Sequence, residues 1–150
     1  MCSVEMQQAL AIENTLREHI ARPGNIPSFG DRLDVRFRGY CAERDDFVIL
    51  MRPENWMCNP SGVIHGGICA TMADQAMGMV AYAAHGGGSI APTIDLNISF
   101  QRRVMPGNDV VLRVRIVAKT TRLIHMAVQG FCADSEDKVC FAASGTFFRS

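Results

Sequence analysis

The chain has 150 residues, with 15 basic and 15 acidic side chains and a formal net charge of zero. This length suits one domain with its own core, so we expect a single domain over residues 1–150. Because the charges balance, no overall field favours a nucleic acid or an anionic membrane as partner. No segment reaches the ~20 apolar residues of a membrane span, and the first residues lack a secretion signal, which predicts a soluble cytoplasmic protein.

The cysteines and histidines show no metal-binding pattern. None of the six cysteines forms a Cys-x-x-Cys pair, and most lie among apolar neighbours. In a reducing compartment such cysteines are usually small buried hydrophobes. The four histidines have no metal-ligand spacing with one another or with cysteine. We therefore expect no metal site.

The first predicted element is an amphipathic helix over about residues 4–21, which ends before Pro23 and Gly24. Apolar and charged residues then alternate from Leu33 to Arg38, which is strand periodicity. A second apolar run, Phe47–Met51, follows after a polar turn. These two segments are expected to form a hairpin.

The most apolar stretch runs from His65 to about Ala84, and only Thr71, Asp74 and Gln75 interrupt it. A helix that is apolar around nearly its whole circumference is typically buried on all sides. We therefore predict a buried central helix over about residues 65–84. The three consecutive glycines after it are expected to end the helix.

Later segments show the two-residue alternation of strands. They cover residues 93–100 and 110–117 and a hairpin of 123–133 with 139–148. Because the connections are short, antiparallel pairing is the economical arrangement. The predicted fold is α+β, with a long central helix wrapped by a curved antiparallel β-sheet and an additional N-terminal amphipathic helix.

Asp74 places a carboxylate inside the apolar central helix. A buried charge is costly unless it is paired or hydrogen-bonded, so Asp74 is either a structural residue bonded to a neighbouring loop or a general base. At the helix start, Gly66 and Gly67 would expose unpaired backbone N–H groups at the positive end of the helix dipole. Such a helix start suits an oxyanion or a polarised carbonyl.

Gly67 and Asp74 are seven residues apart in the sequence, which is roughly 10 Å along a helix axis. Within one helix they cannot contact the same reacting carbonyl. Antiparallel packing of two such helices about a two-fold axis would bring the glycine end of one beside the middle of the other. If both residues act on one atom, their spacing predicts a dimer with active sites shared between subunits.

The polar and glycine positions of this stretch follow one pattern: Asn59-x-x-Gly62-x-x-His65-Gly66-Gly67-x6-Asp74. The pattern resembles the signature of hotdog-fold acyl-CoA thioesterases, in the PaaI-like (phenylacetic acid degradation-related) branch of the 4-hydroxybenzoyl-CoA thioesterase superfamily. The similarity runs from about residue 30 to residue 148 and includes the segment 92–100 and the turn Pro106–Gly107. It implies an enzyme that hydrolyses an acyl-CoA to a carboxylate and free coenzyme A, with no other cofactor.

The resemblance also implies roles for individual residues. The Gly67 N–H would polarise the thioester carbonyl, and Asp74 of the partner subunit would activate water or attack directly as a nucleophile. Asn59 would help to hold the thioester or the water, His65 would orient the loop around it, and Thr93 would position the water. On the residues alone, His65 can equally be a helix cap and Asn59 an ordinary turn residue.

Coenzyme A carries phosphates, which a neutral chain must meet with local basic clusters. The candidates for this part of the substrate are a helix-start glycine and two basic pairs at a strand end and a turn: Gly66, Arg102, Arg103, Lys119 and Arg122. The four cations can equally be solvated charges at strand ends. The family also implies that dimers pair into a homotetramer.

Two other functions are compatible with the sequence. A non-catalytic acyl-CoA-binding hotdog module would share the fold, but the presence of Asn59, Gly67 and Asp74 disfavours it. A hotdog hydratase or dehydratase would pair a histidine with an acid across the dimer, whereas the position of His65 at the helix start is typical of a structural residue. Thioester hydrolysis is the leading hypothesis. The sequence does not predict which acyl group the substrate carries.

Overall fold

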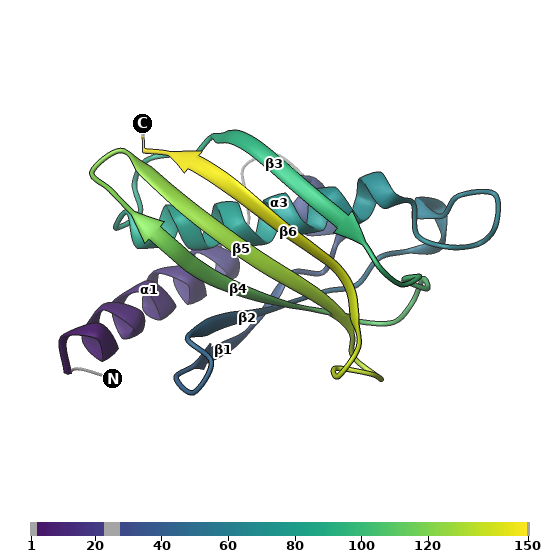
Figure 1. The fold of residues 1–150 in the computed structure, drawn as a ribbon, viewed down its shortest axis with the longest axis horizontal. Coiled ribbons are helices and arrows are strands. Elements are labelled where there is room, and N and C mark those ends of the chain that lie inside the picture. The colour runs from purple at the N-terminus through teal and green to yellow at the C-terminus, as the bar shows by residue number, and fades with distance from the viewer. Residues whose placement is uncertain (1–2, 23–27, 150) are drawn as a thin grey trace.

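The computed structural model describes residues 3–22 and 28–149. They form helices and one six-stranded sheet (Figure 1). In chain order the elements are α1 (Ser3–Ala21), α2 (Phe29–Arg32), β1 (Arg36–Cys41), β2 (Asp46–Met51), the 3-10 turn η1 (Asn55–Met57), α3 (Gly66–Ala84), β3 (Thr93–Phe100), β4 (Val110–Lys119), β5 (Leu123–Cys132) and β6 (Val139–Phe148). Within the described ranges, every helix is too short or too polar to cross a bilayer.

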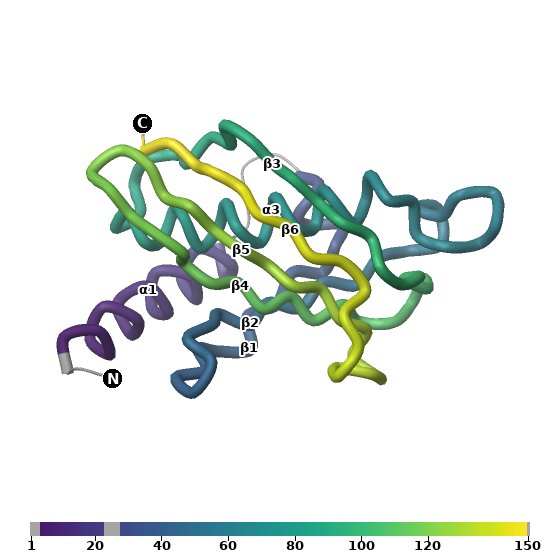
Figure 2. Tube along the Cα trace, viewed as in Figure 1, coloured from purple at the N-terminus to yellow at the C-terminus, as the bar shows by residue number. Residues whose placement is uncertain are grey.

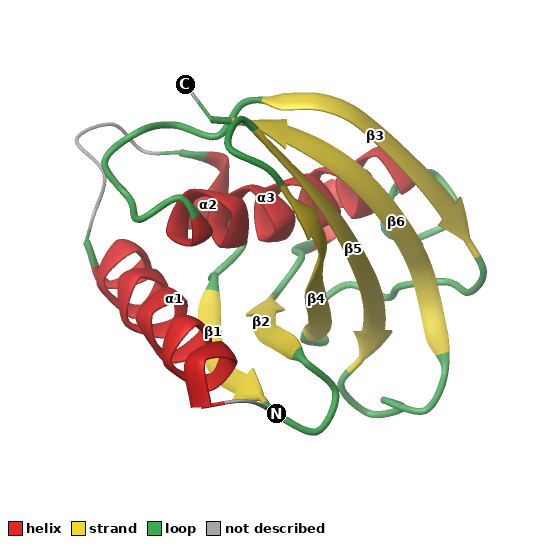
Figure 3. Ribbon diagram, turned by 60° about the vertical axis from the view of Figure 1, so that its left-hand side comes forward, coloured by secondary structure: helices red, strands yellow, loops and turns green. Residues whose placement is uncertain are grey.

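All neighbouring strands of the sheet run antiparallel, in the order β1-β2-β4-β5-β6-β3. The sheet curls around α3, and α1 packs against α3 and β1 (Figures 2 and 3). This confirms the predicted α+β fold with a central helix inside a curved antiparallel sheet. β3 is the last strand of the sheet, so its outer edge has no strand partner in the part of the chain that is described.

The core lies between α3 and the concave face of the sheet. Its largest fully buried side chains on the sheet come from four adjacent strands, β2, β4, β5 and β6: Ile49, Met51, Leu112, Ile124, Met126, Phe141 and Phe147. Alternate residues of these strands point the same way, so the strand periodicity seen in the sequence corresponds to one buried face.

Gly130 of β5 lies opposite Phe141 of β6, and a Cβ at this position would overlap the phenyl ring. We expect Gly130→Ala to lower the free energy of unfolding by about 2 kcal/mol, the usual cost of overpacking a core. Urea unfolding followed by circular dichroism measures this change. Ser144→Ala, at an exposed position of β6, is the control and should stay within about 0.5 kcal/mol. An unchanged free energy for Gly130→Ala would contradict the overlap.

The first strand begins later than the sequence predicts. The alternation suggests a start at Leu33, but β1 starts at Arg36 because the short helix α2 precedes it. Ser28 and Asp31 form a capping box, in which the Ser28 N–H donates to the Asp31 carboxylate over 2.6 Å. Asp34 then takes a φ of 47°, which interrupts extended backbone. The Ser-x-x-Asp spacing is the sequence signal for this helix.

The central helix has the expected extent, because α3 covers Gly66–Ala84 with His65 as its N-cap. The hydropathy predicts a helix that is buried on all sides, but α3 is not. One stripe of the helix stays at least partly exposed: Gly67, Thr71, Asp74, Gln75, Gly78 and Tyr82. These residues recur every three or four positions and therefore share a face. The pattern misses this face because glycine and threonine carry little polar signal.

Candidate active site

Asp74 lies in the middle of the partly exposed stripe of α3, beside the first residue of β3. The Thr93 hydroxyl donates a hydrogen bond of 2.7 Å to Asp74 Oδ1. Asp74 is half-buried and Thr93 is exposed. The carboxylate is therefore anchored to the edge of the sheet and still accessible from outside the chain. Thr93, the residue expected to position water, thus lies in direct contact with the Asp74 carboxylate.

The first two backbone N–H groups of α3 differ in their hydrogen bonding. His65 Nδ1 accepts a hydrogen bond of 3.0 Å from the Gly67 N–H, the group expected to polarise the thioester. The Gly66 N–H donates to no group within residues 3–22 and 28–149. An N-cap side chain binds the second or third N–H of a helix and leaves the first one open. This capping rule is the signal that points to Gly66.

Removing the His65 cap should destabilise the protein. We expect His65→Ala to lower the free energy of unfolding by about 1 kcal/mol, because the start of α3 loses a side-chain acceptor. His65→Asn keeps an acceptor at the N-cap and should stay within about 0.5 kcal/mol of the wild type. Chemical denaturation of the three proteins makes the comparison. Equal losses for both variants would mean that the cap bond does not stabilise the helix.

Asn59 builds the loop that leads into α3. Its side-chain oxygen accepts hydrogen bonds from the N–H groups of Ser61 (2.9 Å) and Val63 (3.3 Å). The loop is tied to the β3–β4 connection, because the Ile64 N–H donates to the carbonyl of Val104 over 2.9 Å. With its oxygen engaged in the loop, the Asn59 side chain has its amide NH₂ to offer to a ligand.

One chain holds both halves of the predicted site but does not join them. The Asp74–Thr93 pair lies about two turns along α3 from the helix start. A Cβ on Gly66 would lie 3.3 Å from Phe100 Cζ, so the end of β3 packs against the beginning of α3. β3 therefore runs antiparallel to the first half of the helix. The candidates gathered at the helix start are Asn59, His65, Gly66 and Gly67.

The four basic candidates divide between the two ends of α3. Arg102 and Arg103 follow β3, near the helix start, and Arg102 donates to a carbonyl of β6 over 2.8 Å. Lys119 at the end of β4 donates instead to the carbonyl of Ala84, the last residue of α3. A cation there is stabilised by the negative end of the helix dipole. Arg122 is exposed in the β4–β5 turn. Of the four basic candidates, only Arg102 and Arg103 therefore lie at the end of α3 that carries Gly66 and Gly67.

Comparison with known proteins supports the sequence resemblance. A family model described as the thioesterase superfamily matches residues 61–139, which is more than half of the chain. Mouse acyl-coenzyme A thioesterase 13 is 24% identical over 118 residues, which cover 79% of this chain and 83% of that protein.

Solved structures show the same fold. The E. coli PaaI protein, from the phenylacetic acid degradation operon, has a TM-score of 0.77 at 14% identity, over 95% of this chain and 96% of its own. A putative thioesterase from Ralstonia eutropha, a phenylacetic acid degradation-related protein, has a TM-score of 0.76 at 20% identity, over 90% and 99%. A Streptococcus mutans protein bound to acetyl-CoA has a TM-score of 0.69 at 18% identity, over 86% and 96%. The hotdog fold is thus confirmed, and with the family model this shows that the chain belongs to the thioesterase superfamily.

Proposed function

We propose that this protein hydrolyses an acyl-CoA thioester to a carboxylate and free coenzyme A. The observation that carries the proposal is the Asp74 carboxylate, which Thr93 holds on the accessible face of a helix whose first N–H is open. The thioesterase family supports it, as do the mouse acyl-coenzyme A thioesterase and the acetyl-CoA bound by the S. mutans relative.

Asp74 can act in two ways. As a general base, it takes a proton from a water that attacks the thioester carbonyl carbon, while Thr93 positions that water. As a nucleophile, it attacks the carbonyl carbon itself and forms an anhydride that water then hydrolyses. In both routes a tetrahedral oxyanion forms and the thiolate of coenzyme A leaves. Neither route needs a metal or a redox cofactor, and coenzyme A enters only as part of the substrate.

The oxyanion needs a hydrogen-bond donor, and we assign the Gly66 N–H to it. This N–H is open and lies at the positive end of the α3 dipole. The Gly67 N–H, which the resemblance implies for this role, becomes available when His65 leaves it. The amide NH₂ of Asn59 supplies a second donor from the loop.

The two halves of the site would meet across a dimer interface at the free edge of β3. Thr93 at one end of this strand lies beside Asp74. Phe100 at the other end lies beside Gly66. Antiparallel pairing of β3 with its copy about a two-fold axis would therefore place Asp74 near Gly66 of the partner subunit. Ile94 and Phe100, which are 57% and 56% exposed in the single chain, would be covered there.

The binding of coenzyme A phosphates is assigned to Arg102 and Arg103, which lie at the glycine end of α3. Arg122 stays a weaker candidate, and Lys119 already holds the other end of the helix. The pairing of dimers into a tetramer and the cytoplasmic location stay predictions, as does the single domain over residues 1–150. Size-exclusion chromatography with light scattering tests the assembly, and a monomer at micromolar concentration would contradict a shared site.

A thiol-release screen with aryl, short, medium and long acyl-CoAs tests the function. Release of free thiol with at least one of them supports hydrolysis and reveals the acyl group. Binding by calorimetry without thiol release would favour the non-catalytic acyl-CoA-binding module. Loss of the ultraviolet absorbance of an enoyl-CoA without thiol release would favour the hydratase.

A further inference from the structure

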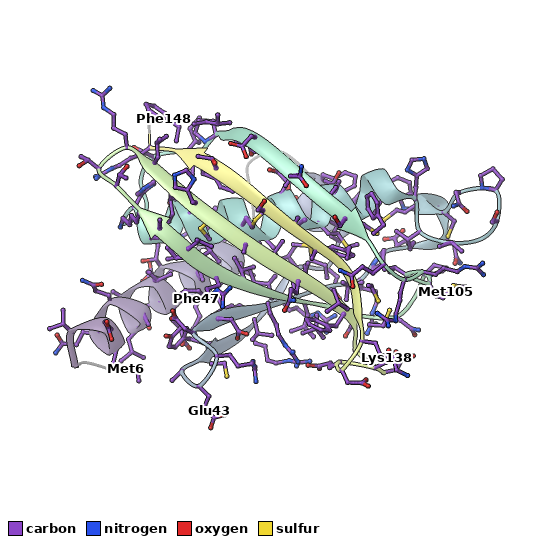
Figure 4. All side chains as sticks on the ribbon, viewed as in Figure 1. Met6, Glu43, Phe47, Met105, Lys138 and Phe148 are labelled. Atoms are coloured by element: carbon purple, nitrogen blue, oxygen red, sulfur yellow. The ribbon has the colours of Figure 1, made fainter. Side chains whose placement is uncertain are left out.

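Two buried cysteines meet where β5 ends and β6 begins. The sulfur atoms of Cys132 and Cys140 are 3.5 Å apart, and both residues are free thiols. Figure 4 labels Lys138 in the turn that joins the two strands. A disulfide needs a sulfur–sulfur distance of about 2.05 Å. The two sulfurs therefore have to approach by only about 1.5 Å to form a bond.

The backbone at Cys140 is irregular. Gly130 and Phe131 are consecutive on β5, but their partners on β6 are Phe141 and Val139, so Cys140 is the extra residue of a β-bulge. A bulge interrupts the hydrogen-bond ladder between two strands and leaves its extra residue unpaired in that ladder. The ladder between β5 and β6 therefore does not hold Cys140 against a shift toward the neighbouring sulfur.

The cysteine pair contacts the segment that follows β3. The Cys140 carbonyl accepts hydrogen bonds from the N–H groups of Gln101 (2.8 Å) and Arg102 (2.9 Å). Cys132 Sγ lies 4.0 Å from the carbonyl oxygen of Arg103. The two cysteines thus contact the backbone of both arginines to which the binding of coenzyme A phosphates is assigned.

The same segment is joined to the start of α3. The Val104 carbonyl accepts a hydrogen bond of 2.9 Å from the N–H of Ile64, which comes two residues before Gly66. Cys69 is buried in the first turn of α3, where burial, and to a smaller extent the nearby Cys140, raises its pKa to about 11. A shift of Cys140 would therefore reach both the arginine pair and the start of α3.

We propose that Cys132 and Cys140 form a reversible disulfide that weakens the binding of coenzyme A and its thioesters. The oxidant is a peroxide. The Cys132 thiolate attacks one peroxide oxygen, the O–O bond breaks, and the departing hydroxide takes up the proton that the thiol lost, which leaves a sulfenic acid and water. The Cys140 thiol attacks the sulfenic sulfur and the second oxygen leaves as water. A thiol reductant reverses the reaction by exchange.

Cys132 is the residue that meets the oxidant, because it is 9% exposed and Cys140 is 3% exposed. Burial, followed by the hydrogen bond to Cys140, raises the pKa of the Cys132 thiol to about 12. Only the thiolate reacts, so oxidation is slow at neutral pH. The pair therefore stays reduced during a brief exposure and responds to sustained peroxide.

The disulfide would act on the site through the backbone of Cys140. Drawing the sulfurs together moves the carbonyl that holds Arg102 and removes the thiol beside the Arg103 carbonyl. We expect the Kd for coenzyme A to rise at least about fivefold, the lower end of typical coupling between two sites. This effect, unlike the disulfide itself, rests on the proposed function.

Peroxide treatment of the full-length protein, followed by mass spectrometry of an unreduced tryptic digest, tests the disulfide. Trypsin cleaves after Lys138, so the bond should join two peptides, and dithiothreitol should separate them. The measurement needs no enzymatic activity. Thiols that stay reduced under sustained peroxide, or a bond from Cys140 to Cys69 instead, would overturn the proposal.

Calorimetry with coenzyme A tests the effect on binding. The Kd should rise at least about fivefold on oxidation and return to its first value with dithiothreitol. An unchanged Kd in the oxidised protein would overturn the regulatory role. A disulfide in a protein whose reduced form binds no coenzyme A would contradict the proposed function and, with it, the effect on the substrate.

Variants assign the effect to this cysteine pair. Cys132→Ala and Cys140→Ala should each abolish both the cross-link and the response of the Kd to peroxide, and circular dichroism checks that they fold. Cys41→Ala, at a half-buried position at the end of β1, is the control and should respond as the wild type does. A full peroxide response in folded Cys132→Ala or Cys140→Ala would overturn the assignment. The peptide map of the wild type decides the disulfide even if a variant is unstable.

Discussion

Asp74→Ala should lower kcat/KM for acyl-CoA hydrolysis by at least about 100-fold, the usual scale for the loss of a catalytic base. In the proposed mechanism this carboxylate either activates water or attacks the thioester, and the Thr93 hydroxyl donates a hydrogen bond to it. Asp74→Asn should lose as much, because the amide has nearly the same shape but can neither take the proton nor act as the nucleophile. Thiol release under steady-state conditions measures both variants.

The control for this prediction is Asp137→Ala, an exposed acid in the β5–β6 turn, which should retain wild-type turnover. Circular dichroism of Asp74→Ala and Asp74→Asn checks that both variants fold. Wild-type kcat/KM in either folded variant would contradict the role of Asp74. A single turnover in ¹⁸O-labelled water then tests the nucleophilic route, because label in the Asp74 carboxylate requires an anhydride that water attacks at the Asp74 carbonyl carbon.

Gly66→Pro should also lower kcat/KM by about 100-fold, the typical cost of losing one donor to an oxyanion. Proline removes the N–H but suits the first position of a helix. His65 has φ −60° and ψ 138°, the extended conformation that a residue before proline prefers. The substitution therefore removes the proposed donor with little strain on the backbone. Thiol release with the acyl-CoA found in the screen measures the effect.

Gly66→Ala is the matched control, because it adds the same Cβ and keeps the N–H. This Cβ would lie 3.3 Å from the Phe100 ring, so a small shift of the ring and a modest loss are expected. The ratio of the kcat/KM values of Gly66→Ala and Gly66→Pro then reports the contribution of the Gly66 N–H. Full activity of Gly66→Pro would return the polarising role to the Gly67 N–H and would require His65 to move away during the reaction.

The same variants test whether the site is shared. If the Asp74→Ala and Gly66→Pro chains are coexpressed, half of the dimers are mixed, and each mixed dimer has one site with both residues intact. Activity should then recover to about a quarter of the wild-type value. Sites confined to single chains would leave the mixture as inactive as its components, and this result would exclude the β3-edge dimer as the catalytic unit.

Local sequence patterns determine most of the fold. The extent of α3 follows from a long apolar run closed by glycines, and the strands of the sheet follow from alternation of apolar and polar residues. These signals are readable because each depends on residues a few positions apart. The early start predicted for β1 fails for a related reason: the capping box of Ser28 and Asp31 is a local signal that competes with the alternation and prevails.

The motif from Asn59 to Asp74 likewise identifies the family from the sequence alone. Only the tertiary structure shows which distant residues lie beside this motif and the helix that carries it. It joins Thr93 to Asp74 and takes Lys119 to the far end of α3. It also leaves one stripe of α3 and one edge of the sheet exposed. The Thr93 and Lys119 contacts join residues 19 and 35 positions apart, and exposure depends on every element packed around a residue, so no local pattern encodes them.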